Sequence, residues 1–210
     1  MIKKLFHLLF RINGWKMKHD VPPEVFGKCV MTAAPHTSLW DAVYALAAFN
    51  EMKIPVRFAI KKEFNYFPVG WFLRSAGALW IDRSATAEER GKKSYVDAMA
   101  EVFGKEEHIC MLIAPEGTRK RTTKWKTGFY HVAKKAGVPI ALGYLDYAKK
   151  EAGVGALVVP SDDMQADMRK IMDFYRNIQG KHPERFALDA RYDQPAPPQP
   201  QAVEGHEAES

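Results

Sequence analysis

The sequence predicts an α/β fold, a single domain in which a mostly parallel β-sheet is flanked by helices. The chain has 210 residues, of which 47% are hydrophobic, enough for one domain with a sizeable core. Short apolar runs alternate with segments of helical periodicity, which is typical of parallel α/β proteins. Polar motifs follow two of these runs, at the strand ends where sites gather in such sheets.

The first element that we expect is a helix over residues 2–12. Its apolar residues recur at helical spacing and basic residues lie beside them: Ile2, Leu5, Phe6, Leu9 and Ile12, with Lys3, Lys4 and Arg11. A basic amphipathic helix suits a membrane surface, so we expect residues 1–20 to form a membrane-surface segment. The same pattern also fits a helix that docks on the body of the protein.

The folded domain is expected over residues 21–190. We expect six strands, at residues 28–34, 56–60, 78–82, 109–114, 139–145 and 155–160. We expect helices at residues 41–50, 68–76, 86–103, 127–136 and 163–178. In the last helix apolar residues, several of them methionines, recur every three or four positions, and Asp162 can cap its start. These methionines fit a buried face better than a cofactor site.

The C-terminal segment 191–210 is expected to be disordered. It is rich in Pro, Gln and Glu and cannot bury enough apolar surface to offset the entropy of ordering. Residues 193–210 hold four acidic and no basic residues, so the net charge of +6 for the whole chain leaves +10 on residues 1–192. A basic body indicates an anionic partner, which could be nucleic acid, a lipid surface or a phosphorylated substrate.

Several classes of protein are disfavoured by composition. No apolar run is as long as the roughly 18–20 residues that a membrane-spanning helix needs. The two cysteines, Cys29 and Cys110, form no disulfide framework and fit a reducing compartment. The seven histidines show no metal-ligand spacing, so we expect no metal site.

The stretch APHTSLWD, residues 34–41, follows the first expected strand. Ser38 can cap a helix that contains Asp41, in the manner of a capping box. His36 would then precede the helix and could turn back to donate a hydrogen bond to the Asp41 carboxylate, which leaves its other ring nitrogen as a base. The alternative is a loop histidine beside a helix-capping aspartate. Because the chain has no G-x-S-x-G motif, a base at His36 would activate a hydroxyl of the substrate.

The stretch IAPEGTRKRTTKWKTG, residues 113–128, carries a cluster of cations after another expected strand. They are Arg119, Lys120, Arg121, Lys124 and Lys126, with Glu116 as the only acid. Cations on a loop that leads into a helix suit a phosphate group. The alternatives are a solvated basic loop and a nucleic-acid patch in which Trp125 stacks on bases. Arg83, at another strand end, could supply a second phosphate contact or a surface salt bridge.

Four segments, taken in order, resemble the sequence blocks of the glycerolipid acyltransferase family, of the lysophosphatidate acyltransferase type. They are PHTSLWD, GALWIDR, APEGTR and GVPIALGY, and WKTG resembles the F-K-x-G that precedes the fourth block. The resemblance covers about residues 28–160. It depends on an H-x4-D block followed about eighty residues later by P-E-G-T-R.

The resemblance implies a glycerol-3-phosphate acyltransferase-like fold and an acyltransferase activity. The acyl group would pass directly from acyl-CoA or acyl-carrier protein to a lysophospholipid hydroxyl, by default that of 1-acylglycerol-3-phosphate, giving phosphatidate. His36 would be the base, oriented by Asp41, and the arginines would hold the glycerol phosphate. The positions that match the family's acceptor site are Arg83, Glu116, Gly117 and Arg119, with Lys126 matched through F-K-x-G.

No metal, cofactor or nucleic-acid partner is implied beyond the thioester co-substrate. Members of the family work at the cytoplasmic face of membranes, which implies a peripheral protein there. Some positions depart from the family pattern: Pro35 replaces Asn, Ala114 replaces Phe, Lys120 replaces Ser, and Leu142 and Gly143 stand where Pro and Val are common. Another lysolipid, including an amino-acid lipid precursor, is an alternative acceptor. A basic nucleic-acid or anionic-surface binding domain is the alternative of a different class.

Overall fold

The computed structural model describes residues 2–54, 56–61, 70–71, 74, 77–81 and 94–193. Several features expected from the sequence fall wholly or partly outside these residues. They include Arg83, most of the helix at 68–76, the last residue of the strand at 78–82, the first part of the helix at 86–103, and the C-terminal segment beyond residue 193.

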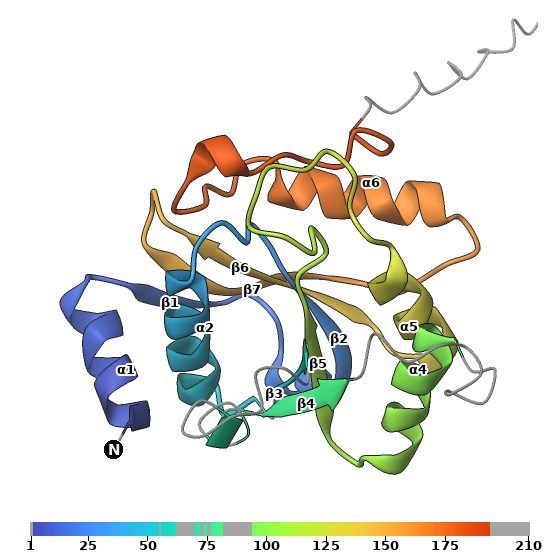
Figure 1. Ribbon diagram of the computed structural model, residues 1–210. Coiled ribbons are helices and arrows are strands. Elements are labelled where there is room, and N and C mark those ends of the chain that lie inside the picture. The colour runs from blue at the N-terminus through green and yellow to red at the C-terminus, as the bar shows by residue number, and fades with distance from the viewer. Residues whose placement is uncertain are drawn as a thin grey trace, which may run out of the picture.

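A seven-stranded sheet forms the centre of the molecule (Figure 1). Its strands are β1 (Lys16–His19), β2 (Lys28–Ala33), β3 (Val56–Lys61), β4 (Ala78–Ile81), β5 (Ile109–Ile113), β6 (Ile140–Asp146) and β7 (Glu151–Val158). Their order is β1-β7-β6-β2-β5-β3-β4, and every neighbouring pair is parallel except β6 and β7. The mostly parallel sheet and all six expected strands are therefore confirmed.

Two features of the sheet differ from the expectation. β1 is an additional strand at the edge, where it pairs with β7 from Lys16 to His19. Its sequence, KMKH, is too short and polar to show a strand pattern. β6 and β7 form an antiparallel hairpin because only residues 147–150 join them, too few for a crossover between parallel strands.

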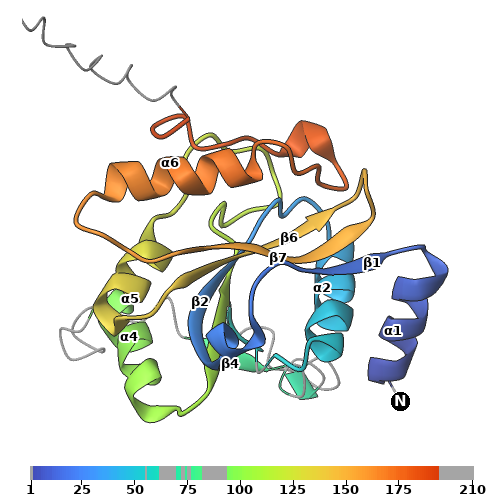
Figure 2. The same ribbon diagram turned by 180° about the vertical axis from the view of Figure 1, so that it is seen from behind.

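Helices cover both faces of the sheet, as the sequence predicts (Figures 1 and 2). They are α1 (Ile2–Ile12), α2 (Trp40–Glu51), α4 (Tyr95–Lys105), α5 (Gly128–Ala136) and α6 (Met164–Tyr175), with the short 3-10 helices η1 (Pro23–Gly27) and η3 (Pro183–Arg185). Successive residues of β2 point to opposite faces. Val30 packs in the core beneath α4, α5 and α6, whereas Cys29 and Met31 pack in the cluster on the α2 side.

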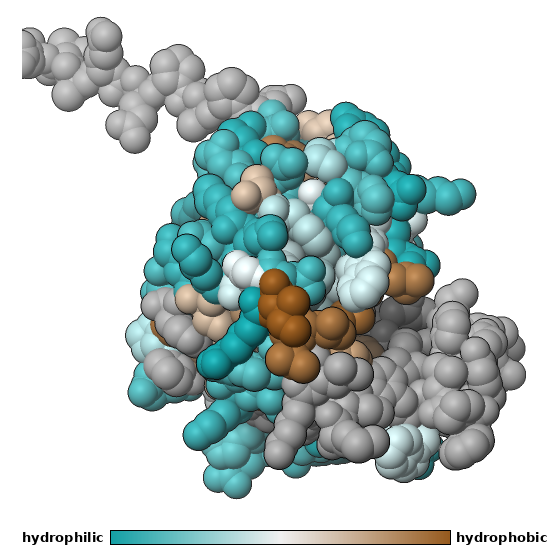
Figure 3. Space-filling view, turned by 90° about the vertical axis from the view of Figure 1, so that its left-hand side faces the viewer, coloured by the Kyte–Doolittle hydropathy of each residue, from teal (hydrophilic) through white to brown (hydrophobic). Residues whose placement is uncertain are grey.

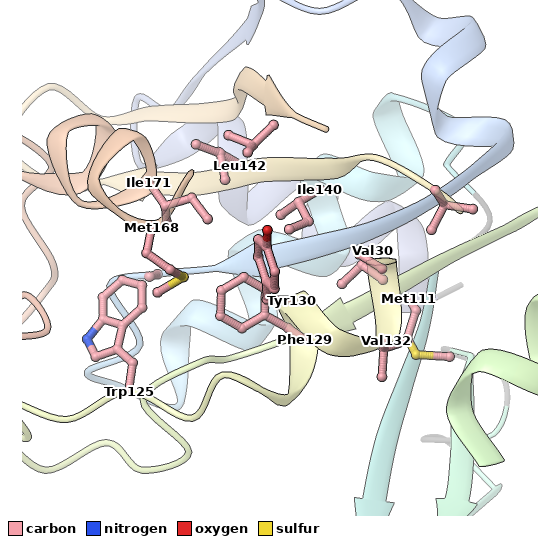
Figure 4. Packing of buried hydrophobic residues seen from close by; sticks show 14 of the residues in the cluster. Val30, Met111, Trp125, Phe129, Tyr130, Val132, Ile140, Leu142, Met168 and Ile171 are labelled. Atoms are coloured by element: carbon pink, nitrogen blue, oxygen red, sulfur yellow. The ribbon is translucent and has the colours of Figure 1, made fainter. Parts of the chain in front are cut away.

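The larger core lies between α5, α6 and the sheet (Figure 4). Phe129, Tyr130 and Val132 of α5 meet Val30, Met111, Ile140 and Leu142 of the strands, and Met168 and Ile171 enter from α6. Met168 and Ile171 are fully buried, which confirms that this helix turns its apolar face to the core. The prediction that Asp162 caps α6 is wrong, because the Asp163 carboxylate accepts the hydrogen bond from the Ala166 backbone N–H.

Helix α1 packs on α2 and also presents apolar side chains outward. Phe10 is buried against Tyr44 of α2, and His7 Nδ1 lies 2.8 Å from Glu51 Oε2. Leu8 and Ile12, one helical turn apart, are 52% and 72% exposed. Figure 3, viewed from the α1 side, shows apolar side chains near the middle of this face. None of the described helices is long and apolar enough to cross a bilayer.

Candidate active site

Two loops singled out by the sequence meet at one edge of the sheet. Residues 34–39 follow β2, and residues 114–127 follow β5. β2 and β5 are neighbours that pair in parallel from Lys28 and Ile109 to Thr32 and Ile113. Because the strands run in the same direction, both loops leave from their carboxyl ends, where α/β proteins commonly form their sites.

The first loop is organised around the carboxylate of Asp41, in the first turn of α2. Asp41 Oδ2 accepts hydrogen bonds of 2.8 Å from the backbone N–H groups of Thr37 and Ser38. The Ser38 hydroxyl oxygen accepts from the Trp40 backbone N–H at 3.2 Å, not from Asp41. Only the carboxylate half of the predicted capping box is thus present, and the N-cap residue of α2 is Leu39.

The predicted pairing of His36 with Asp41 is present in the structure. His36 precedes α2, and its ring nitrogen Nδ1 lies 3.3 Å from Asp41 Oδ2. The Asp41 side chain is 7% exposed, whereas that of His36 is 31% exposed. The geometry directs Nδ1 to the carboxylate and leaves Nε2 as the nitrogen that can meet a substrate.

A residue outside all the predicted motifs completes the surroundings of Asp41. The Tyr147 hydroxyl, from the turn between β6 and β7, donates a 2.8 Å hydrogen bond to Asp41 Oδ1. Burial raises the pKa of Asp41, but hydrogen bonds from His36, Ser38, Tyr147 and Thr37 outweigh burial and hold this pKa below its usual value of 3.8. Asp41 is therefore a carboxylate at neutral pH. No sequence signal marks Tyr147, because it lies in a turn after the last motif.

Glu116, of the second loop, lies against the backbone of His36. It is 6% exposed, and its Oε1 accepts a 2.8 Å hydrogen bond from the His36 backbone N–H. Its Oε2 is buried and has no hydrogen-bond partner among the described residues. Burial raises the pKa of Glu116 to about 7, although the hydrogen bond from His36 acts in the opposite direction. Glu116 thus supports the loop that carries His36.

The other residues matched to the acceptor site lie further along the second loop. Gly117 has φ of +64°, a conformation that favours glycine, and Lys126 Cε lies 2.9 Å from where a Cβ of residue 117 would stand. Lys126 is held next to this turn by its backbone N–H, which donates to the Pro115 carbonyl at 2.8 Å. Arg119 and Lys126 are both exposed. Arg83 is not among the described residues.

A C-terminal strap, residues 177–193, holds the second loop in place. Trp125 donates from its backbone N–H to Asp189 Oδ2 at 2.8 Å and from its indole N–H to the Ala187 carbonyl at 3.0 Å. Arg191 bonds both the Asp189 carboxylate and the Trp125 carbonyl. Trp125 is 2% exposed, so the alternative in which it stacks on nucleic-acid bases is wrong.

The same strap also contacts the first loop and the Tyr147 turn. The His182 backbone N–H donates to the Thr37 hydroxyl at 3.2 Å, and the Tyr147 backbone N–H donates to the Gln179 carbonyl at 2.8 Å.

The strap contains no motif. The helix expected over residues 163–178 ends at Tyr175, so the strap begins where the helical pattern is expected to continue. The sequence also predicts disorder from residue 191, whereas Arg191 bonds the Asp189 carboxylate and Tyr192 is buried in the core.

The Glu116→Gln substitution tests the buried carboxyl through the pH dependence of stability. From pH 4.5 to about 7 the carboxyl is ionised in the unfolded chain and protonated in the fold, so the free energy of unfolding should decrease as pH rises. The decrease should reach about 3 kcal/mol. The glutamine variant should lack this component while its amide oxygen still accepts from His36. Denaturant titrations across this pH range measure both proteins, and parallel pH curves would contradict the assignment.

Comparisons with known proteins bear on the fold and the family of this chain. A search of curated proteins finds no match. The crystal structure of the 1-acyl-sn-glycerophosphate (LPA) acyltransferase PlsC from Thermotoga maritima has a similar fold, with a TM-score of 0.52 and 19% sequence identity over 80% of this chain and 72% of that one. The family model described as Acyltransferase matches residues 17–141, which include both loops. The chain therefore belongs to the Acyltransferase family.

Proposed function

We propose that the protein transfers an acyl group from acyl-CoA or acyl-carrier protein to the free hydroxyl of a lysophospholipid. The observation that carries this proposal is the pair formed by His36 Nδ1 and Asp41 Oδ2, 3.3 Å apart beside a loop rich in cations. The proposed acceptor is 1-acylglycerol-3-phosphate, which gives phosphatidate. The structurally similar Thermotoga maritima enzyme is a 1-acyl-sn-glycerophosphate acyltransferase, which supports this acceptor. Another lysolipid remains the alternative.

In the proposed reaction His36 acts as a general base through Nε2. It removes the proton from the acceptor hydroxyl as the oxygen attacks the thioester carbonyl. The carbon–sulfur bond then breaks, an ester is formed, and the thiolate receives the proton that the imidazolium holds. Asp41 keeps Nδ1 protonated. It also stabilises the positively charged imidazolium that forms when Nε2 takes the proton of the acceptor hydroxyl. Protons and electron pairs balance without a further reactant.

The cations of the second loop are proposed to hold the acceptor phosphate. Arg119 and Lys126 are exposed on the loop whose buried Glu116 contacts the His36 backbone, so an anion bound there would lie close to the base. Arginine can bind phosphate through two parallel hydrogen bonds. Arg83 is included in this role through its match to the family block. Glu116 is proposed to support the His36 loop, because its side chain is buried and accepts a hydrogen bond from the His36 backbone N–H.

Direct transfer, without a cysteine acyl-enzyme, fits the positions of the two cysteines. Cys29 and Cys110 are both fully buried in the sheet, with their sulfur atoms 3.5 Å apart, so neither thiol is presented to a substrate. The contact with Cys29 and burial also raise the pKa of the Cys110 thiol, which disfavours the nucleophilic thiolate.

The lipid substrates and helix α1 support a peripheral location on the cytoplasmic face of a membrane. An acceptor with a long acyl chain resides in a lipid surface, and a protein that acts on it must approach that surface. Leu8 and Ile12 give α1 two exposed apolar side chains on adjacent turns, and Arg11 lies beside them. Such a face can enter the interface of an anionic bilayer.

The activity is tested with purified protein, several lysolipids and several acyl donors, with products identified by mass. The wild type should form phosphatidate from 1-acylglycerol-3-phosphate, and His36→Ala should lower turnover by about 10²–10⁴-fold because the base is lost. His131→Ala, at an exposed position on α5, is the matched control and should keep full activity. Near wild-type turnover in His36→Ala would exclude His36 as the base.

The role of α1 is tested by replacing its two exposed apolar residues. The double variant Leu8→Asp, Ile12→Asp should bind anionic vesicles about ten-fold or more weakly, because it loses apolar burial and gains charge repulsion. Co-sedimentation with vesicles measures the binding. Val159→Asp, which changes an equally exposed apolar residue after β7, is the control and should bind as the wild type does. Equal binding by all three proteins would remove α1 from the membrane contact.

A further inference from the structure

Tyr147 contacts the candidate dyad from outside every motif of the family. It lies beyond residues 17–141, the part of the chain that the family model matches. Its hydroxyl is nevertheless 2.8 Å from Asp41 Oδ1, although the two residues are 106 positions apart in the sequence. The contact therefore depends on the fold and on the hairpin between β6 and β7.

The position of the Tyr147 hydroxyl is fixed by three different parts of the protein. Its ring packs edge-on against Trp15, with ring centres 4.8 Å apart and planes at 86°. The Tyr44 ring of α2 also packs edge-on against the Tyr147 ring, with ring centres 6.0 Å apart and planes at 70°. The Tyr147 backbone N–H donates to the Gln179 carbonyl of the strap at 2.8 Å. Packed aromatic edges and a backbone hydrogen bond leave the ring little freedom to turn away from Asp41.

The two oxygens of Asp41 have different partners. Oδ2 accepts from the Thr37 and Ser38 backbone N–H groups and lies 3.3 Å from His36 Nδ1. Among the described residues, the hydrogen-bond partner of Oδ1 is Tyr147. A carboxylate held through one oxygen can still rotate about its last side-chain bond, whereas contacts on both oxygens fix its plane.

We propose that Tyr147 is a positioning residue that fixes the plane of the Asp41 carboxylate and, through it, the tautomer and orientation of His36. The inference rests on the proposed role of His36 as the base. Metal-binding and catalytic histidines are commonly oriented by a carboxylate that is itself held by a further hydrogen bond. The Tyr147 hydroxyl would hold the Asp41 carboxylate in this way.

The protonation states agree with this geometry. Burial, together with the hydrogen bond to Asp41, raises the pKa of Tyr147 above its usual value of 10, so the hydroxyl keeps its proton and remains a donor. The same hydrogen bond helps to keep the pKa of Asp41 low, so the acceptor keeps its charge. Donor and acceptor are therefore both in the required form at neutral pH.

The Tyr147→Phe variant tests the proposal because it removes the hydroxyl and keeps the ring that packs on Trp15 and Tyr44. We expect turnover to fall about ten-fold or more while KM for donor and acceptor changes less than about two-fold, as loss of orientation without loss of binding requires. Tyr44→Phe is the matched control. It removes a hydroxyl from the same aromatic cluster without touching Asp41 and should leave turnover unchanged.

A second readout needs no substrate. The ¹⁵N chemical shifts of the His36 ring, assigned with a His36→Gln variant, report which nitrogen carries the proton in the neutral ring. We expect the Nδ1–H tautomer in the wild type and in Tyr44→Phe, and a mixture with Nε2–H in Tyr147→Phe.

If the wild type is active, four outcomes decide whether Tyr147 positions the pair. A fall in turnover together with a mixed tautomer supports the proposal. Unchanged turnover in Tyr147→Phe, a fall matched by Tyr44→Phe, or a fall with an unchanged tautomer each overturn it. If the wild type itself transfers no acyl group, the proposed function fails, whereas the tautomer comparison still decides whether Tyr147 positions the pair.

Discussion

The buried carboxylate of Asp41 is the constraint on which the rest of the candidate site depends. A charge that leaves water is tolerated only where hydrogen bonds replace the lost hydration. Two backbone N–H groups and the Tyr147 hydroxyl supply them, and the first turn of α2 adds the favourable end of the helix dipole. The turn from Thr37 to Asp41 cannot open without leaving this charge unpaired. The position of His36 follows from that requirement.

The sheet and the strap extend this local arrangement into a site. The parallel pairing of β2 with β5 brings the two loops to the same edge, where Glu116 bonds the His36 backbone. The strap, residues 177–193, then bonds both loops and the Tyr147 turn. The sheet and the strap thereby fix the loop of the proposed base relative to the loop of the proposed phosphate-binding cations, although the two loops lie far apart in sequence. Such preorganisation lowers the entropy that a two-substrate reaction must lose in its transition state.

Features with a local physical signature could be predicted from the sequence. The apolar strands, the buried face of α6 and the His36–Asp41 pair all depend on residues close together in the chain, and the structure contains each of them. Features that depend on distant contacts could not. Strand β1 is defined by its pairing with β7, and the contact of Tyr147 with Asp41 spans 106 positions. The cap at Asp163 is a local contact, but a sequence pattern does not fix the end of a helix to within one residue. The strap contains only the short 3-10 helix η3, so its sequence has no repeating apolar pattern that could predict its path.

Neutron diffraction from crystals of the unliganded protein at about pH 8, where an ordinary histidine is neutral, tests the central claim most directly. The account predicts a deuterium atom on His36 Nδ1 directed at Asp41 Oδ2, none on Nε2, and the Tyr147 hydroxyl deuterium directed at Asp41 Oδ1. A deuterium atom on Nε2, or an imidazole ring turned away from Asp41, would contradict it.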